Sequence, residues 1–169
     1  MALYLIPNGA AGLTAAPVAV TTGTAIKTML QIKAGATGPL KVVEWGISFS
    51  GSAAAAPGNV ELVETDVAAT VTAHVTAGIV KLDAAALAGG DPVTDRIPVG
   101  TTATGYTSAG EGSTTVARLF DLQKIAPTGQ YVKQFPLGRE PLIQVSKFLR
   151  VRATFAAAVD AYCYVIVEV

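Results

Sequence analysis

The amino-acid sequence predicts a single all-β domain, an antiparallel β-sandwich that is most simply a jelly roll, with one short helix and long loops. A chain of 169 residues is long enough for one core and gives no sign of a second domain. Apolar and polar residues alternate with a period of two in about eight or nine short segments, which glycine and proline turns separate. An immunoglobulin-like sandwich is the second choice, because the chain has no pair of cysteines.

Residues 1–23 are predicted to form an N-terminal arm with a first strand, and residues 24–169 to form the sandwich domain. A strand is expected at residues 1–6, because a Pro-Asn-Gly turn signal follows it. Apolar and polar residues alternate again over residues 24–34. This pattern predicts a strand with one buried face and one exposed face.

Residues 40–50 predict the next strand, in which Trp45 and Phe49 contribute much of the core, since each aromatic ring buries on the order of 150 to 250 Å². Because side chains of a strand alternate between its two faces, one face is predicted to consist of Lys41, Val43, Trp45, Ile47 and Phe49. Gly46 within the strand indicates a bulge or a close neighbour. A loop is expected over residues 51–58.

Two further strands are expected at residues 59–65 and 69–75, which places His74 on the more polar face of a strand. Residues 76–113 are predicted to be an irregular insertion, with a short helix at residues 83–88 that ends at a Gly-Gly pair. Long loops in a compact domain are usually functional or interfacial. This insertion is therefore one expected contact region.

The last third of the chain predicts a strand at residues 114–125, an extended and bent connector at residues 131–143, and two more strands. The connector cannot be helical, because its prolines lack an N–H group and restrict the preceding residues. A strand is predicted at residues 148–155, with alternate side chains on opposite faces. The core face consists of Leu149, Val151, Ala153 and Phe155, and the other face of Phe148, Arg150, Arg152 and Thr154. The apolar strand at residues 161–169 is expected to be central in a sheet.

The charge of the chain is balanced, with 12 basic and 12 acidic residues. Broad binding of nucleic acid or of an anionic membrane requires a basic surplus or a clustered basic face, so neither partner is expected. No apolar stretch approaches the roughly 18 to 20 residues that cross a bilayer. The N-terminal apolar run lacks the basic start of a signal peptide, so we expect a product made and kept in a cytoplasm.

The surface composition favours a subunit of an assembly. Charged residues make up 14% of the chain and apolar residues 51%, which is low in charge for a soluble monomer. Such a chain is expected to bury surface against neighbouring subunits. A GC-rich genome that favours alanine is an equally good explanation of the same composition.

Residues that usually build catalytic and metal sites are scarce. Cys163 and His74 are the single cysteine and histidine, so no intrachain disulfide and no structural zinc site can form. Glu61, Glu64 and Asp66 form an acidic cluster, but their spacing differs from that of a calcium loop. No phosphate-binding glycine motif occurs. We therefore predict no catalytic residue, no metal and no cofactor, and a protein that is not an enzyme.

Charged residues near the C-terminus form the candidate site, which we interpret as a structural or interface network of Lys133, Arg139, Glu140, Arg150 and Arg152. In this interpretation Phe135 and Leu137 pack over the sandwich, and Arg139→Ala impairs folding or assembly. A basic patch that includes Arg118 near Tyr131 is one alternative. The simpler alternative is ordinary pairing of these cations with solvent or with Glu140, Asp121 and Glu111.

Four segments have a resemblance to a known group of proteins: VVEWGISFSG (42–51), VELVETDVAATVTAH (60–74), YVKQFPLGREP (131–141) and SKFLRVRATF (146–155). They resemble small virion proteins encoded among the structural genes of tailed bacteriophages of actinobacteria and related prophages. The resemblance covers most of the chain from about residue 41 onward and leaves the first forty residues unmatched.

The resemblance implies a decoration or cement protein that binds the outside of the phage head, with a tail or head-fibre component as a close variant. The implied partners are further copies of the chain, with a homotrimer favoured, and the major capsid protein. The implied location is the capsid surface of the virion, after assembly in the host cytoplasm. The expected contact regions are residues 1–17 and the insertion at residues 76–113.

Two other classes of function stay open on the sequence. A carbohydrate-binding β-sandwich needs exposed aromatic residues, and the candidates are Tyr4, Tyr106, Tyr131, Tyr162 and Tyr164. The last two lie in the terminal strand and are expected to be buried. A cupin-like enzyme needs several histidines around a metal, which a single histidine does not provide.

Overall fold

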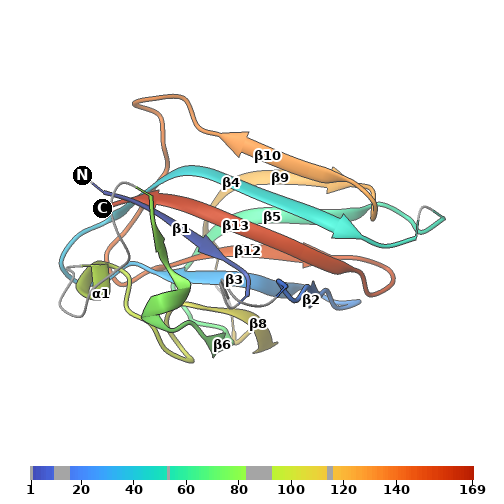
Figure 1. Ribbon diagram of the computed structural model, residues 1–169, viewed down its shortest axis with the longest axis horizontal. Helices are drawn as coiled ribbons and strands as arrows, with labels where there is room; N and C mark the ends of the chain where they lie inside the picture. Colours follow the sequence, from blue (N-terminus) through green and yellow to red (C-terminus); the bar gives the residue numbers. More distant parts are fainter. Residues whose placement is uncertain (1, 10–15, 53, 83–92, 114–115) are drawn as a thin grey trace.

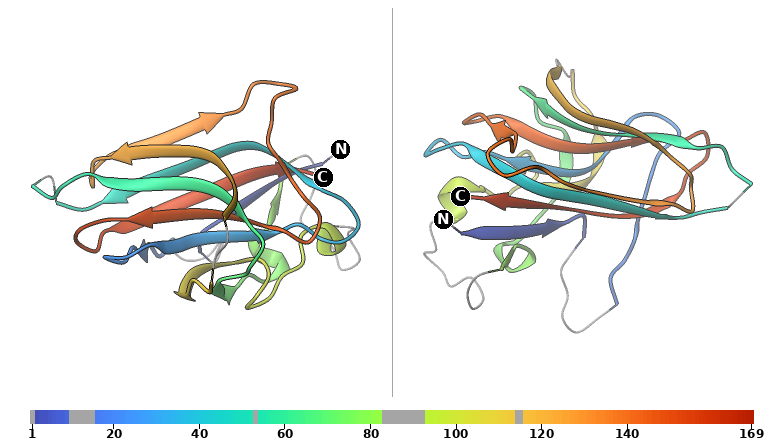
Figure 2. Two further views of the ribbon diagram at one scale, coloured as in Figure 1. Left: turned by 180° about the vertical axis from the view of Figure 1, so that it is seen from behind. Right: turned by 90° about the horizontal axis from the view of Figure 1, so that it is seen from above.

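The predicted all-β sandwich is confirmed by the computed structural model, which describes residues 2–9, 16–52, 54–82, 93–113 and 116–169. Two antiparallel sheets pack face to face (Figures 1 and 2). The two termini lie side by side, where the backbone N–H of Ala2 donates to the carbonyl oxygen of Val169 at 3.2 Å. The helix predicted at residues 83–88 lies outside the described residues.

Sheet A has the strand order β10-β4-β13-β1-β7, with β11 beside β4 and β2 beside β13. Its strands are β1 Leu3–Pro7, β2 Val20–Thr21, β4 Leu40–Ser50, β7 Val80–Lys81, β10 Gln130–Gln134, β11 Leu142–Ile143 and β13 Asp160–Glu168. Sheet B has the order β6-β8-β3-β12-β5-β9. Its strands are β3 Lys27–Lys33, β5 Gly58–Thr65, β6 Thr70–Ala73, β8 Gly105–Gly110, β9 Val116–Ile125 and β12 Phe148–Thr154.

The strand pairing is that of a jelly roll. β1 pairs with β13 and β4 with β10 in sheet A, while β3 pairs with β12 and β5 with β9 in sheet B. Strands from the beginning of the chain thus pair in nested order with strands from its end. This nested pairing across two sheets agrees with the jelly-roll topology that the sequence predicts.

The insertion between β5 and β9 is more regular than the sequence predicts. Within residues 76–113 the chain forms a 3-10 turn η1 (Thr76–Gly78), strand β7, a one-turn helix α1 (Val93–Arg96) and strand β8. Strand β8 pairs with β3 and with β6, so part of the predicted irregular segment is a strand of sheet B. The sequence of β8, GYTSAG, has two glycines and no run of bulky apolar residues, so alternation of apolar and polar residues does not predict a strand there.

Strand β1 is an interior strand of sheet A, between β13 and β7. Its side chains Tyr4 and Ile6 are buried in the core. Leu3–Pro7 is therefore part of the sandwich and not of a peripheral arm, so we expect its removal to unfold the domain. The buried pair Asn8 and Cys163 extends this strand, because Asn8 exchanges backbone and side-chain hydrogen bonds with Cys163 at 2.8 and 2.9 Å.

The core between the sheets follows the predicted alternation, with one shift of phase. Trp45 and Phe49 are buried as predicted, and the ring centres of Phe49 and Phe155 lie 4.7 Å apart. The pairing of β13 with β4 shifts register between Ile166 and Val167, and beyond this irregularity Val42 is buried in place of Val43. Such a shift inserts one residue and reverses the faces that follow it. The predicted face of β4 is therefore correct from Trp45 onward and wrong before it.

Strands β3 and β12 are buried on both faces, although the sequence predicts an exposed face for β3. The segment that follows β5 lies over the outer face of sheet B, where the Ala69 N–H donates to Oε1 of Gln31 at 2.8 Å. Glu111, which follows β8, bonds Thr28 of β3 on the same side. The insertion thus buries the centre of sheet B from outside. In the described part of the chain, no helix is long and apolar enough to span a membrane.

Candidate functional site

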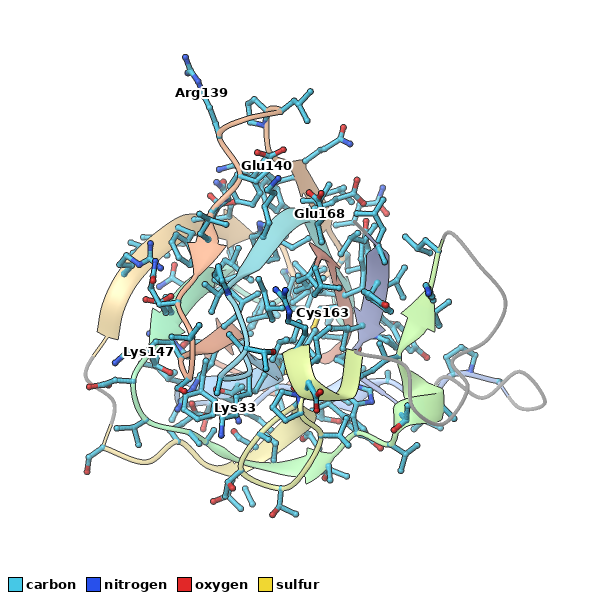
Figure 3. All side chains as sticks on the ribbon, turned by 90° about the vertical axis from the view of Figure 1, so that its left-hand side faces the viewer. Lys33, Arg139, Glu140, Lys147, Cys163 and Glu168 are labelled. Atoms are coloured by element: carbon cyan, nitrogen blue, oxygen red, sulfur yellow. The ribbon has the colours of Figure 1, made fainter. Side chains whose placement is uncertain are left out.

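The five predicted site residues do not meet in one network. Lys133 forms an ion pair with Asp121 between β9 and β10, whereas Arg150 and Arg152 lie on the outer face of β12 and form ion pairs with Glu111 and Glu61. Arg139 and Glu140 lie on the loop between β10 and β11, and the Arg139 side chain points away from the body of the protein (Figure 3). The simpler alternative, pairing with individual acids, holds for Lys133 with Asp121 and for Arg150 with Glu111.

Arg150 is fully buried on the outer side of β12. Its Nη1 lies 3.3 Å from Oε2 of Glu111, and its Nη2 donates to the carbonyl oxygen of Val67. Burial lowers the pKa of Arg150 and the charge of Glu111 opposes that shift. A buried charge is tolerated when it is paired and hydrogen-bonded, so Glu111 and the Val67 carbonyl tie the insertion to the centre of sheet B.

Arg152 makes the second buried ion pair of this face. Its Nη2 lies 2.8 Å from Oε1 of Glu61 on the neighbouring strand β5, directly across the register of the two strands. The Nε atoms of Arg150 and Arg152 have no hydrogen-bond partner among the described residues. Arg150 therefore joins the covering segment to sheet B and Arg152 joins β12 to β5, and both guanidinium groups are buried away from solvent.

Lys133 belongs to a cluster around the buried carboxylate of Asp121, which connects the edge strands of the two sheets. The Oδ2 atom of Asp121 accepts hydrogen bonds from Trp45 Nε1 at 3.2 Å and from the Tyr131 hydroxyl at 3.0 Å. Its Oδ1 atom lies 3.3 Å from Lys133 Nζ and accepts from Gln123 at 2.9 Å. The carboxylate is saturated with donors, so its role is structural.

The electrostatics of this cluster favour the ionised acid. Burial raises the pKa of Asp121, but hydrogen bonds from Gln123 and Tyr131 and the charge of Lys133 outweigh burial, and the net pKa is lowered. Burial and the bond to Asp121 raise the pKa of Tyr131 to about 12. A carboxylate that stays charged and already accepts several bonds is not a general base.

The acidic cluster that the sequence suggests is dispersed by the fold. Glu61 pairs with Arg152, whereas Glu64 is buried and accepts a hydrogen bond from Arg118 Nε at 3.0 Å. Asp66 is exposed beyond the end of β5. Successive strand residues point to opposite faces, so Glu61 and Glu64 lie on different sides of sheet B. In the described residues no group of three His, Cys, Asp or Glu side chains is placed to hold a metal ion.

The single histidine and the single cysteine are both buried. His74 lies after β6 and not on an exposed polar face, which corrects the sequence expectation. Its Nε2 bonds the Pro7 carbonyl oxygen at 2.7 Å, its ring packs against Tyr106, and burial lowers its pKa. Cys163 lies on the inner face of β13 (Figure 3), and burial raises its pKa. Neither group forms a nucleophile or metal site in this arrangement.

The loop from Phe135 to Pro141 projects from the β9–β10 edge of the sandwich (Figures 1 and 3). At its base Phe135 packs on the core, and its backbone N–H donates to Val43 at 2.9 Å. The turn closes where Arg139 N–H donates to the Pro136 carbonyl at 2.9 Å, with Gly138 at a φ of 79°. At its tip Leu137 is 95% exposed, so the expectation that it packs over the sandwich is wrong.

The geometry thus offers a contact surface and no assembled reaction centre in the described part of the chain. Besides Leu137, the β9–β10 edge exposes Leu119, Leu122 and Val132. Sequence reasoning missed Leu119 and Leu122 as a pair, because they lie on either side of a register irregularity between β9 and β5 that no local alternation records. The signal that predicts an exposed Leu137 is its position between Pro136 and Gly138, which is typical of a tight turn. Comparison of the chain with family models, with curated proteins and with solved structures finds no match.

Proposed function

We propose that the protein is a structural component of a tailed-bacteriophage virion, a decoration or cement protein that binds the outside of the head. In this proposal it is not an enzyme. It acts as a closed homotrimer on the capsid surface and contacts the major capsid protein. Attachment of the trimer stabilises the shell by mass action, because the protein binds the assembled state and not the dissociated capsomers.

The observation that supports this proposal most is the exposure of Leu137 on a turn of fixed shape. A leucine side chain gains roughly 1.5–3 kcal/mol when it moves from water into an apolar contact. At 95% exposure Leu137 realises almost none of this gain within one chain. A neighbouring subunit that buries it receives the gain once for every copy in a closed oligomer.

Further support comes from the charge and from the fold. A formal net charge of zero imposes no overall repulsion between copies of the chain. The jelly roll presents the projecting loop and the edge leucines on a rigid framework, and preorganised surfaces lose little conformational entropy on association. Both properties suit a subunit whose task is to hold neighbours in place.

The proposal is tested by the oligomeric state of the purified protein, followed by co-sedimentation with phage heads that lack it. A trimer that sediments with heads supports the proposal. A monomer that does not associate with heads contradicts it. Electron microscopy of gold-labelled protein on intact particles separates the close variant, because a tail or fibre component places the label on the tail or on fibres.

A further inference from the structure

A groove of about 380 Å³ crosses the outer face of sheet A, over strands β1, β4, β10 and β13. Its volume lies in the range of roughly 300–1,000 Å³ that small-molecule sites occupy. Tyr162 and Tyr164 of β13 line it, with Leu5 on one side and Val132 on the other. The sequence places these two tyrosines in a buried strand, but they lie on its outer face, and Tyr162 is 42% exposed.

Both tyrosine rings are held in place by their neighbours. Gly46 faces Tyr164 across the two strands, and a Cβ atom at Gly46 would lie 2.6 Å from the ring, so only glycine lets the ring rest on the sheet. The Tyr164 hydroxyl donates to Oε1 of Glu44 at 2.6 Å. The Tyr162 hydroxyl donates to the Pro17 carbonyl at 2.8 Å. The groove therefore presents two oriented aromatic rings.

Two polar side chains beside the rings have unused hydrogen-bonding capacity. Ser48 and Gln130 line the groove on β4 and β10, directly opposite each other in the strand register. Neither side chain bonds to another described residue, whereas the side-chain amide of Asn8 donates to the Ala161 carbonyl oxygen and accepts from the Cys163 N–H. A ligand in the groove thus meets a hydroxyl and a carboxamide that no other described residue satisfies.

The charge of the groove restricts its ligand. Among the described residues that line it there is no lysine, arginine, aspartate or glutamate. A charged ligand would lose its hydration and find no counter-charge, so the groove suits a neutral one. An apolar peptide would cover Ser48 and Gln130 without replacing their bonds to water, which costs affinity. A neutral sugar ring instead has an apolar C–H face for the tyrosines and hydroxyl groups for the two polar side chains.

We infer that this groove binds neutral oligosaccharides, with the pyranose C–H face against Tyr162 and Tyr164 and hydroxyl groups bonded to Ser48 and Gln130. This activity goes beyond the proposed role on the head and does not depend on it. The groove lies on the outer face of sheet A, whereas Leu137 lies on the projecting loop. Val132 belongs to both the groove and the β9–β10 edge, so the two activities are distinguished by variants of Tyr162, which lies in the groove, and of Leu137, which lies outside it.

The test is an array of neutral oligosaccharides in the gluco, galacto, manno and N-acetylglucosamine series, probed with the labelled protein and followed by calorimetric titration of the best binder. Tyr162→Ala is expected to weaken that binder by about tenfold or more, which is about 1.4 kcal/mol. Tyr162→Phe keeps the ring and is expected to bind within about twofold of the wild type. The matched control is Val80→Ala, an exposed residue of sheet A outside the groove.

Ser48→Ala and Gln130→Ala provide a second arm if Tyr162→Ala fails to fold, and each is expected to weaken binding by about fivefold. Three results overturn the inference: no oligosaccharide on the array binds, the best binder is unaffected by all of these variants, or a proline decapeptide binds at the groove while no sugar does. The last result assigns the groove to an extended peptide instead.

Discussion

The Nη1 atom of Arg150 lies 3.3 Å from Oε2 of Glu111, and this contact joins the centre of sheet B to the insertion that covers it. Arg150 has no exposed surface, while Glu111 also accepts hydrogen bonds from Thr28. The insertion is thus attached to the sandwich by a charge pair as well as by the pairing of β8 with β3. Because the insertion packs on the outer face of sheet B, strand β12 is buried on both faces.

Glu111→Ala is expected to lower the free energy of unfolding by about 3 kcal/mol, because it leaves the guanidinium of Arg150 buried without its partner. The measurement is urea denaturation of the variant and the wild type. The matched control is the double variant Glu111→Ala with Arg150→Met, which removes both charges and is expected to recover much of the loss. Equal stability of the single variant and the wild type would show that the pair does not hold the insertion.

Asp121→Asn is expected to remove part of the pH dependence of stability. The pKa of Asp121 is lowered in the folded state from the ordinary value of 3.8, so the unfolded chain binds more protons in acid and stability decreases as pH falls below that value. Urea denaturation at about pH 3 and at neutral pH measures this decrease. The wild type should lose more stability between the two conditions than the variant does. Identical losses would contradict the assignment of the ionised carboxylate to this cluster.

Gly58→Ala tests the packing of the core. A Cβ atom at Gly58 would lie 2.4 Å from the buried ring of Phe155, so the ring must move and the stability should fall by about 3 kcal/mol. Gly110→Ala is the matched control, since no atom lies within 4 Å of the added Cβ there. Thermal unfolding compares the two. A Gly58 variant as stable as the Gly110 variant would contradict the packing of β5 against Phe155.

Arg139→Ala is expected to leave the free energy of unfolding within about 0.5 kcal/mol of the wild type, because the side chain is exposed and points into solvent. This result reverses the expectation from the sequence alone, which assigned Arg139 to a network that folding needs. Lys133→Ala is the informative comparison, since it removes an ion pair with the buried Asp121. If Arg139→Ala is the more destabilising of the two, the loop has contacts that this account lacks.

Much of the fold follows from local patterns. The alternation in β4 and β13 and the turn residues between strands are sufficient for the sandwich, and they predict the bounds of β4, Leu40–Ser50, correctly. The phase shift before Trp45 depends on a register irregularity with β13, which no local pattern records. Strand β8 was missed because its pairing with β3 is decided by distant residues and not by its own composition.

The candidate site was less predictable, because side-chain partners come from distant parts of the chain. Lys133 and Arg150 were interpreted as members of one network, but they form the ion pairs with Asp121 and Glu111 that the simpler alternative describes. The exposure of Tyr162 on a central strand depends on whether another element covers that face of the sheet. In sheet B the insertion covers the face of Arg150, whereas among the described residues no segment buries Tyr162 on the outer face of sheet A. Sequence alternation describes two faces and does not say which of them a distant segment covers.

The central claim, that the protein works as a closed assembly through its projecting loop, is tested most directly by the molar mass of the protein in solution and of its Leu137→Asp variant, measured by light scattering. We expect a wild-type mass of about three times the 17.2 kDa of one chain, and a monomer for the variant, with unchanged thermal stability of the monomer fold. A wild type that is monomeric at all concentrations, or a variant that assembles as the wild type does, would contradict it.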